Sequence, residues 1–270
     1  MNLKKVNEFG RYLEIVDSYK RKRCLTNDYL YNEVADLIVH DSLYECCGAD
    51  NAFLFVKKDE CFRVYYYLNN LAELQIFDVN ENLVTEILFR GNLGTPDVEM
   101  DYLTKCGFKP LLRRDQFVGV YKDLVKPVLI QAVSVQKAKT LNDVTEACDL
   151  FNCTFDHFSG DYISEMMEQK LFADGNIWIA RDANGHFAGA LHQTIERGVA
   201  WISHVAVLPV YRKQGIGQAL LDAFVEHNHV DEKSRYMLWV QAQNQPAVKM
   251  YQKKGFKYTN KSTMSMLKHK

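Results

Sequence analysis

The chain has 270 residues, a length that corresponds to one or two domains. Apolar residues make up 47% of it, enough for one or two hydrophobic cores, so wholesale disorder is excluded. Its 33 basic residues are balanced by 34 acidic ones, and the resulting net charge of −1 excludes a general attraction to nucleic acid or to an anionic membrane.

Local features of the sequence predict a cytoplasmic protein. No apolar run approaches the ~20 residues of a transmembrane helix, and residues 1–22 lack the apolar stretch of a signal peptide. The 7 cysteines contain no Cys-x-x-Cys pair, which is typical of reduced thiols. Neither the cysteines nor the histidines have the spacing of a metal site, so we expect no metal.

The first half predicts a mixture of helices and strands. Apolar residues at helical spacing predict two helices within residues 1–45. Further on we expect strands over 52–56, 62–68, 73–77 and 116–121, and helices over 81–89 and 97–105. Because a proline before a strand interrupts regular structure, Lys126-Pro127 is the expected boundary between domains 1–126 and 127–270.

The second half predicts strands and helices in the order β-α-α-β-β-β-α-β-α-β, an α/β fold of the α+β type with a mixed sheet. The expected strands are 129–135, 176–181, 187–194, 200–207, 237–240 and a last one ending near 267. The expected helices are 140–151, 161–171, 215–227 and 246–254.

A glycine-containing turn between a strand and a helix predicts an anion site. Residues 205–218 read Val-Ala-Val-Leu-Pro-Val-Tyr-Arg-Lys-Gln-Gly-Ile-Gly-Gln. The first N–H groups of a helix favour an anion, and Gly215 and Gly217 allow a phosphate close to the backbone. Arg212 and Lys213 add positive charge. Taken alone, this pattern is equally typical of a tight turn without a ligand.

A second motif makes the pattern specific. It reads Asn-x-x-Ala-x-x-x-Tyr-x-x-x-Gly-Phe from Asn244 to Phe256. With Arg-x-x-Gly-x-Gly from Arg212 to Gly217, it resembles motifs A and B of the GNAT (Gcn5-related N-acetyltransferase) superfamily. The resemblance covers roughly residues 129–267 and implies the GNAT fold for the C-terminal half.

The resemblance implies acetyl-CoA as the acyl donor. In this family the donor lies where the motif A strand diverges from the next strand, here residues 200–207 and 237–240. Its pantetheine arm pairs with the first strand, and its pyrophosphate lies at the helix start. The residues implied to hold it are Val205, Val207, Arg212, Lys213, Gln214, Gly215, Ile216, Gly217, Gln218, Asn244 and Lys253.

The resemblance also implies catalytic roles. Tyr251 stands where the family has the general acid that protonates the leaving thiolate, although a buried aromatic residue fits the same position. Several members carry a glutamate base on one of the two strands, but neither strand has one here. His204 is a candidate base, as is Glu165 in an acidic helical region. The alternatives are a packed, hydrogen-bonded histidine at position 204 and a solvated acidic helix face that contains Glu165.

The first half resembles a degenerate copy of the second. Gly107-Phe108 echoes Gly255-Phe256, each at the end of a helix, and the hairpin 52–68 echoes 176–194. The first half lacks the Gly-x-Gly turn, and Leu103 stands in place of Tyr251. We expect a smaller GNAT-like α/β half, as in mycothiol synthase, that does not bind acetyl-CoA and shapes the acceptor cleft. An unrelated α/β cap is the alternative.

These features together predict an N-acetyltransferase that transfers acetyl from acetyl-CoA to a primary amine by direct attack in a ternary complex. Two alternatives stay open: a CoA-thioester-binding sensor without turnover, and an acyltransferase that uses a longer acyl-CoA. The expected acceptor is the amine of a small molecule or a peptide. We expect no nucleic acid or membrane partner, and the chain could form a homodimer.

Overall fold

The protein is described from a computed structural model, which covers residues 3–21, 23–58, 60–127 and 133–270. The chain forms two compact units. Unit 1 contains residues 1–113 and 261–270, and unit 2 contains residues 114–260. Both ends of the sequence therefore belong to unit 1.

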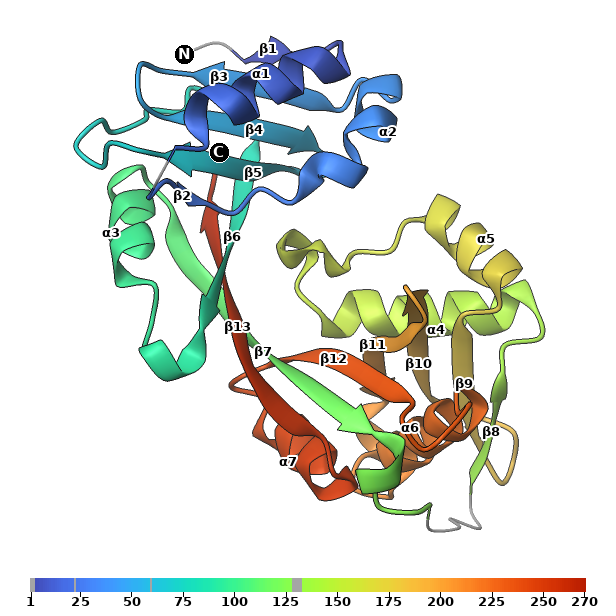
Figure 1. Cartoon of the computed structure of the whole chain (residues 1–270). Helices are drawn as coiled ribbons and strands as arrows, with labels where there is room; N and C mark the ends of the chain where they lie inside the picture. Colours follow the sequence, from blue (N-terminus) through green and yellow to red (C-terminus); the bar gives the residue numbers. More distant parts are fainter. Residues whose placement is uncertain (1–2, 22, 59, 128–132) are drawn as a thin grey trace. The chain divides into compact units, whose positions relative to one another are not determined.

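Unit 1 consists of one sheet with short helices (Figure 1). Its sheet runs β1-β3-β4-β5-β6-β13, with β5 and β6 parallel and the other neighbours antiparallel, and β2 pairs with β5. The helices and strands that lie wholly or partly in unit 1 are β1 Lys4–Lys5, α1 Phe9–Tyr19, β2 Leu25–Thr26, η1 Leu30–Asn32, α2 Val34–Val39, β3 Leu43–Cys47, β4 Ala52–Lys57, β5 Cys61–Leu68, β6 Asn82–Arg90, η2 Gly91–Leu93, α3 Asp97–Lys105, β7 Lys109–Val120 and β13 Lys257–Lys268.

Unit 2 has the same kind of sheet, in the order β7-β12-β11-β10-β9-β8. Here β11 and β12 are parallel and the other neighbours are antiparallel. Its elements are η3 Tyr121–Asp123, β8 Val133–Lys137, α4 Leu141–Thr154, η4 His157–Asp161, α5 Glu165–Asp174, β9 Ile177–Asp182, β10 Phe187–Glu196, β11 Val199–Val207, η5 Pro209–Tyr211, α6 Ile216–His227, β12 Arg235–Gln241 and α7 Gln245–Lys254, together with the ends of β7 and β13.

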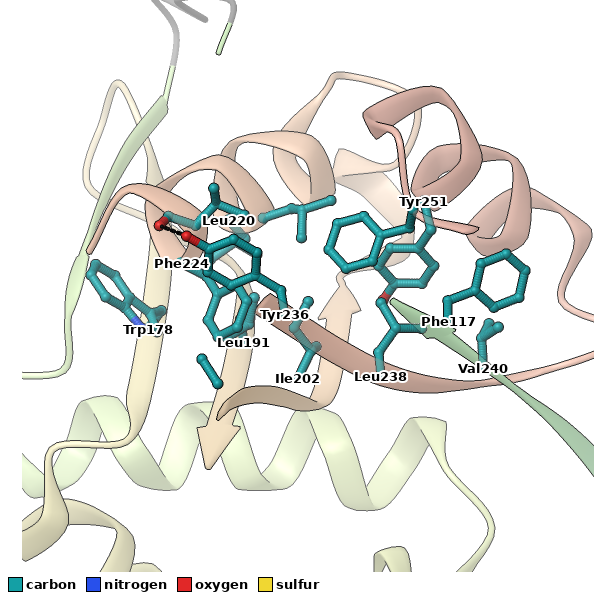
Figure 2. Packing of buried hydrophobic residues seen from close by; sticks show 14 of the residues in the cluster. Phe117, Trp178, Leu191, Ile202, Leu220, Phe224, Tyr236, Leu238, Val240 and Tyr251 are labelled. Atoms are coloured by element: carbon teal, nitrogen blue, oxygen red, sulfur yellow. Dashed lines mark hydrogen bonds between the residues drawn. The ribbon is translucent and has the colours of Figure 1, made fainter. Parts of the chain in front are cut away.

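Helices cover both faces of the sheet in unit 2. Alternate residues of a strand point to opposite faces, so the buried strands contribute side chains to a core on each face. Ile177 and Ile179 of β9 pack with α4 and α5, whereas Trp178 and Ala180 pack with α6 and α7. Figure 2 shows the second of these cores, in which Tyr236, Leu238 and other buried residues meet α6 and α7. At the start of α4, Thr140 and Asp143 form the predicted capping box.

Most predicted elements are present, but the helix expected over 81–89 is wrong: this segment is strand β6. Leu83 and Ile87 have helical spacing, yet Val84, Thr85 and Ile87 are β-branched, and β6 pairs on both sides with β5 and β13. Residues 73–77, expected as a strand, lie in an irregular connection. The helix expected from 161 begins at Glu165.

The units divide at 113/114 and 260/261, whereas the sequence places the boundary at 126/127. Residues 114–120 of β7 pair with β12 of unit 2, and residues 261–268 of β13 pair with β6 of unit 1. Both strands therefore contribute residues to both units. The strand expected over 129–135 falls partly outside the described residues, and its described part is the start of β8.

Candidate acyl-donor site

The start of α6 has the backbone geometry that an anion site needs. Gly215 is the N-cap, with a φ of 83°, and Lys213 two residues earlier has a φ of 62°. The left-handed backbone is freely available to glycine, which explains the residue at 215. No side chain caps α6, so its first N–H groups are left for another acceptor. A phosphate fits this donor set.

Two glycines allow close approach at the same place. A Cβ on Gly217 would lie 3.2 Å from Sδ of Met250, and one on Gly189 would lie 2.7 Å from the carbonyl oxygen of Ala206. Gly189 was missed by the sequence analysis, although a glycine within a strand is a recognisable sign that another backbone lies close. Any side chain at Gly189 would displace the end of β11.

The strand that leads to α6 leaves its parallel neighbour just before this point. Pairing between β11 and β12 extends only from Ala200 with Tyr236 to Ile202 with Leu238. Val205 and Val207 lie beyond the paired region and are half-buried. The predicted divergence and the start of α6 thus follow each other along the chain.

The polar residues of the turn are exposed, as a site for a charged ligand requires. The Nε–H of Arg212 donates to the carbonyl oxygen of Val207 at 3.1 Å, and the amide of Gln214 donates to the carbonyl oxygen of Val210. Lys213 is also exposed. Among the predicted donor-binding residues, Ile216 places its side chain in the core, so only its backbone N–H can face a ligand.

Three further residues predicted to bind the donor, Asn244 and Lys253 of the α7 region and Gln218 of α6, have different surroundings. Asn244 is the N-cap, and its side-chain oxygen accepts from the N–H of Ala247 at 3.2 Å. Lys253 is exposed in the last turn. Gln218 of α6 donates to Asp222, so its side chain supports its own helix. Asn244 therefore has a structural role in addition to any contact with a ligand.

Tyr251 is buried, with only 6% of its surface exposed. Figure 2 shows it among Phe117, Leu238 and Val240, and its ring also lies near Phe256. Burial raises the pKa of Tyr251 well above its ordinary value. The phenol is therefore protonated at neutral pH. A general acid must be protonated, and a buried tyrosine with a packing role alone would be protonated as well.

His204 is buried beneath α4 and hydrogen-bonded to a second histidine. Its ring stacks on Phe151 and lies 5.0 Å from Phe155, measured between ring centroids. Nδ1 of His204 lies 3.1 Å from Nδ1 of His192, directly opposite on β10. Burial, with His204 nearby, lowers the pKa of His192 to about 3. His192 was not foreseen, because its importance comes from the pairing of β10 with β11.

Glu165, the acidic candidate, lies with other carboxylates on the helical side of the unit. Glu165 is exposed in the first turn of α5, whereas Glu168 accepts from the hydroxyl of Thr145 at 2.9 Å. Asp156 accepts from the N–H of Ser159. In the described part of the chain, His, Cys, Asp and Glu form no cluster able to hold a metal ion. No helix there combines the length and apolarity that a membrane-spanning segment needs.

Comparisons with known proteins agree on the family. Residues 144–256 match the family model described as acetyltransferase (GNAT) family. Mycothiol acetyltransferase of Clavibacter sepedonicus is 29% identical over 101 residues, which cover 35% of this chain and 31% of that protein. This chain thus matches less than a third of the length of that curated relative.

Solved structures share the fold. A GCN5-related N-acetyltransferase from Sphaerobacter thermophilus is 14% identical with a TM-score of 0.59, over 81% of this chain and 76% of that one. A GNAT-family acetyltransferase from Colwellia psychrerythraea is 13% identical with a TM-score of 0.56, over 100% of both chains. A tandem GNAT protein from the clavulanic acid biosynthesis pathway is 11% identical with a TM-score of 0.53, over 84% and 82%.

The family implies an acyl-CoA donor, and the uncapped start of α6 with its exposed cations suits the phosphates of such a molecule. Residues 144–256, which lie within unit 2, are therefore assigned to the GNAT acetyltransferase superfamily.

Proposed function

We propose that unit 2 is an N-acetyltransferase that transfers an acetyl group from acetyl-CoA to a primary amine by direct attack in a ternary complex. The observation that carries the proposal is the uncapped N-terminus of α6, which follows the strand that diverges from β12. An extended ligand with amides and phosphates matches both features, because a strand edge binds amides and a helix start binds phosphate.

In this proposal the turn and the strand hold the donor. Acetyl-CoA supplies an activated thioester. Backbone groups of Val205 and Val207 bind its arm, and the N–H groups from Gln214 to Gln218 bind its pyrophosphate. Arg212, Lys213 and Lys253 add positive charge, and Asn244 orders the start of α7. The N–H of Val207 stabilises negative charge that develops on the acyl oxygen.

Two side chains move protons in the proposed reaction. An amine nucleophile must lose a proton, and a thiolate leaving group must gain one. Tyr251 donates its phenolic proton to the sulfur, which its raised pKa allows at neutral pH. His204 accepts the proton from the amine, held in place by Phe151 and by His192. Glu165 is the second candidate base, and it acts through water because it is exposed.

Donor binding is tested by isothermal titration of acetyl-CoA and of free CoA. Gly217→Glu places bulk near Met250 and a negative charge at the start of α6. We expect it to weaken binding by more than 100-fold, about 2.7 kcal/mol. Gly10→Glu is the matched control, because a Cβ on Gly10 meets nothing within 4 Å. Unchanged affinity of Gly217→Glu would contradict the proposed site.

Proton donation by Tyr251 is tested with Tyr251→Phe. We expect turnover with an amine substrate to fall by roughly 10²-fold while affinity for acetyl-CoA stays nearly constant, since only the hydroxyl is lost. Tyr31→Phe on the exposed surface of unit 1 is the control. Equal turnover of Tyr251→Phe and the wild type would remove Tyr251 from the mechanism.

A second candidate function is binding of a CoA thioester without turnover. It is favoured by the absence of a carboxylate from β11 and β12 and by the burial of His204. A panel of amines distinguishes the two functions. Binding of acetyl-CoA without acetylation of any amine would support the sensor, and transfer to an amine would support the enzyme.

A further inference from the structure

Strand β5 of unit 1 has one edge that its parallel neighbour only partly covers. On one side β5 pairs with β4 from Phe62 to Tyr67. On the other side it pairs with β6 over three positions, from Cys61 with Asn82 to Arg63 with Val84. Beyond Arg63 the parallel pairing ends, as it does beyond Ile202 of β11 in unit 2. Backbone groups at such an edge need other partners.

The side chain of Asn27 supplies these partners. Its Oδ1 accepts from the N–H of Tyr66 at 2.8 Å. Its Nδ2 donates to Oγ1 of Thr85 at 3.0 Å and to the carbonyl oxygen of Glu86 at 2.9 Å, and lies 3.3 Å from the carbonyl oxygen of Val64. Thr85 in turn donates to Val64 at 2.7 Å. One amide thus connects the diverging strands β5 and β6.

The residues before Asn27 complete the same edge. Leu25 and Thr26 form β2, which pairs antiparallel with Leu68 and Tyr67 of β5. Asp28, next along the chain, accepts from the hydroxyl of Tyr12 at 2.8 Å and from that of Tyr67. From Cys61 to Leu68, β5 is therefore covered first by β6, then by Asn27 and finally by β2.

The connection from β5 to β6 also lacks the parts of a phosphate site. Residues 69–81 are described throughout and contain no helix, whereas α6 follows β11 in unit 2. They contain Glu73, Asp78 and Glu81 and no lysine or arginine, which disfavours a phosphate. The hollow that remains beside Asn27 has a cavity volume of about 10 Å³, space for about one water molecule and far below the ~300 Å³ of small ligand pockets.

We infer that residues 24–28, which we call the closing segment, occupy in unit 1 the position that an acyl-CoA arm takes in unit 2. Unit 1 is thereby closed by its own chain, and the protein binds one acyl-CoA, in unit 2. The inference rests on the proposed function for the identity of the ligand only, because the contacts of the closing segment do not depend on it.

The number of ligands tests one part of the inference. We expect titration of acetyl-CoA into the full chain to give one site, and Gly217→Glu to remove it. A site that persists in Gly217→Glu and disappears when a bulky side chain is placed in unit 1, as in Asn27→Trp, would overturn the inference. If acetyl-CoA does not bind at all, the proposed function is contradicted. The contacts of the closing segment are then tested by the stability experiment, which needs no ligand.

Stability tests the closing segment without any ligand. Asn27→Ala removes one acceptor and two donors from a half-buried network, and we expect the melting temperature of unit 1 to fall by roughly 5–10 °C. Asn32→Ala, at an exposed asparagine of the same unit, is the control. We expect Asn27→Asp to destabilise as well, because a carboxylate cannot donate to Glu86 or Val64.

Hydrogen exchange of the wild type gives a readout that needs no variant. We expect the amide of Tyr66 to be strongly protected in the free protein and equally protected with acetyl-CoA, because Asn27 already accepts from it. Fast exchange that slows with acetyl-CoA would overturn the inference, as would an Asn27→Ala protein as stable as Asn32→Ala.

Discussion

The buried pair His192 and His204 links the candidate base to the stability of unit 2. Their rings are nearly parallel, 11° apart, and their Nδ1 atoms share one proton position. One ring must therefore donate and the other accept, so one of the two Nδ1 atoms carries no proton when the pair is intact. Nε2 of His192 is buried without a hydrogen-bond partner among the described residues. A proton on Nε2 of His192 therefore finds no hydrogen-bond acceptor among the described residues.

His192 should make unit 2 less stable in mild acid. Its pKa is about 3 in the folded protein and near 6.5 when unfolded, so the unfolded state binds more protons between these values. Stability is complete above pH 6.5 and decreases as the pH falls towards 3. At pH 5 the loss from this group is about 2 kcal/mol.

Urea unfolding at pH 7.5 and pH 5 checks this expectation with His192→Gln, which keeps a hydrogen bond to His204 but does not titrate. We expect the variant to lose less stability between the two pH values than the wild type. His186→Gln, at an exposed histidine, is the control and should resemble the wild type. An identical pH dependence in His192→Gln would contradict the assignment.

At the residue scale, the sequence predicted the roles of residues whose surroundings come from nearby positions in the chain. Gly215 could be placed at a helix start because the turn and the apolar face of the helix are local. His192 and Asn27 could not be interpreted, because each acts on a residue of another strand, and Gly189 within its strand gave only a sign that another backbone lies close. Spacing predicted Tyr251 on α7 but not the degree of its burial.

Helices α6 and α7 are joined by a buried ion pair. Nζ of Lys254 lies 2.6 Å from Oδ1 of Asp222 and donates to the carbonyl oxygen of Val125, also at 2.6 Å. Lys254 is only 2% exposed. Asp222 accepts from Gln218 as well, so the pair connects the first turns of α6 to the end of α7.

Removal of the lysine should therefore destabilise unit 2. Lys254→Met leaves the Asp222 carboxylate buried without its cation, at an expected cost of about 3 kcal/mol. Lys253→Met changes the exposed neighbour and should shift stability by no more than ~0.5 kcal/mol. The double variant Lys254→Met/Asp222→Leu should recover part of the loss. Chemical denaturation measures all three, and a stable Lys254→Met protein would contradict the expected cost.

At the element scale, prediction was successful where caps and turns mark the ends. Thr140 with Asp143, and Gly255 at the end of α7, define their helices locally. Strand β6 was predicted as a helix because one of its two partners, β13, comes from a distant part of the chain. A segment with apolar residues four apart can form either structure, and the pairing of β6 with β13 decides it.

The chain forms two units, and strands β7 and β13 each contribute residues to both of them. Each unit has a sheet in which the parallel pair is followed by one last antiparallel strand. For β6 in unit 1 this strand is β13, and for β12 in unit 2 it is β7. The two orders of helices and strands otherwise correspond, except that residues 69–81 stand in place of α6 and that β2 of unit 1 has no counterpart strand in unit 2.

This arrangement predicts that the end of the sequence stabilises unit 1. Met266 is fully buried in the core of unit 1, so Met266→Ala should cost about 2–5 kcal/mol. The loss should appear as faster hydrogen exchange in β5 and β6. Met166→Ala, at a methionine of unit 2 that is 82% exposed, is the matched control. Faster exchange confined to unit 2 would contradict the predicted effect.

At this scale the sequence predicted two related halves and a mixed sheet, but not the division of the chain. The proline at 127 is a local sign of interrupted structure, whereas the boundaries at 113/114 and 260/261 follow from pairings across more than 100 residues. Such pairings leave no mark in composition or spacing.

The exchange of strands sets an order for folding during synthesis. Residues 261–268 are made after the whole of unit 2, yet β6 cannot complete its ladder without them. A nascent chain that has emerged as far as residue 260 can therefore fold unit 2, since β7 is already available, while β6 still presents an open edge. Unit 1 is synthesised first but completes its folding second. A chaperone that protects exposed strand edges is therefore expected to stay bound longest at unit 1.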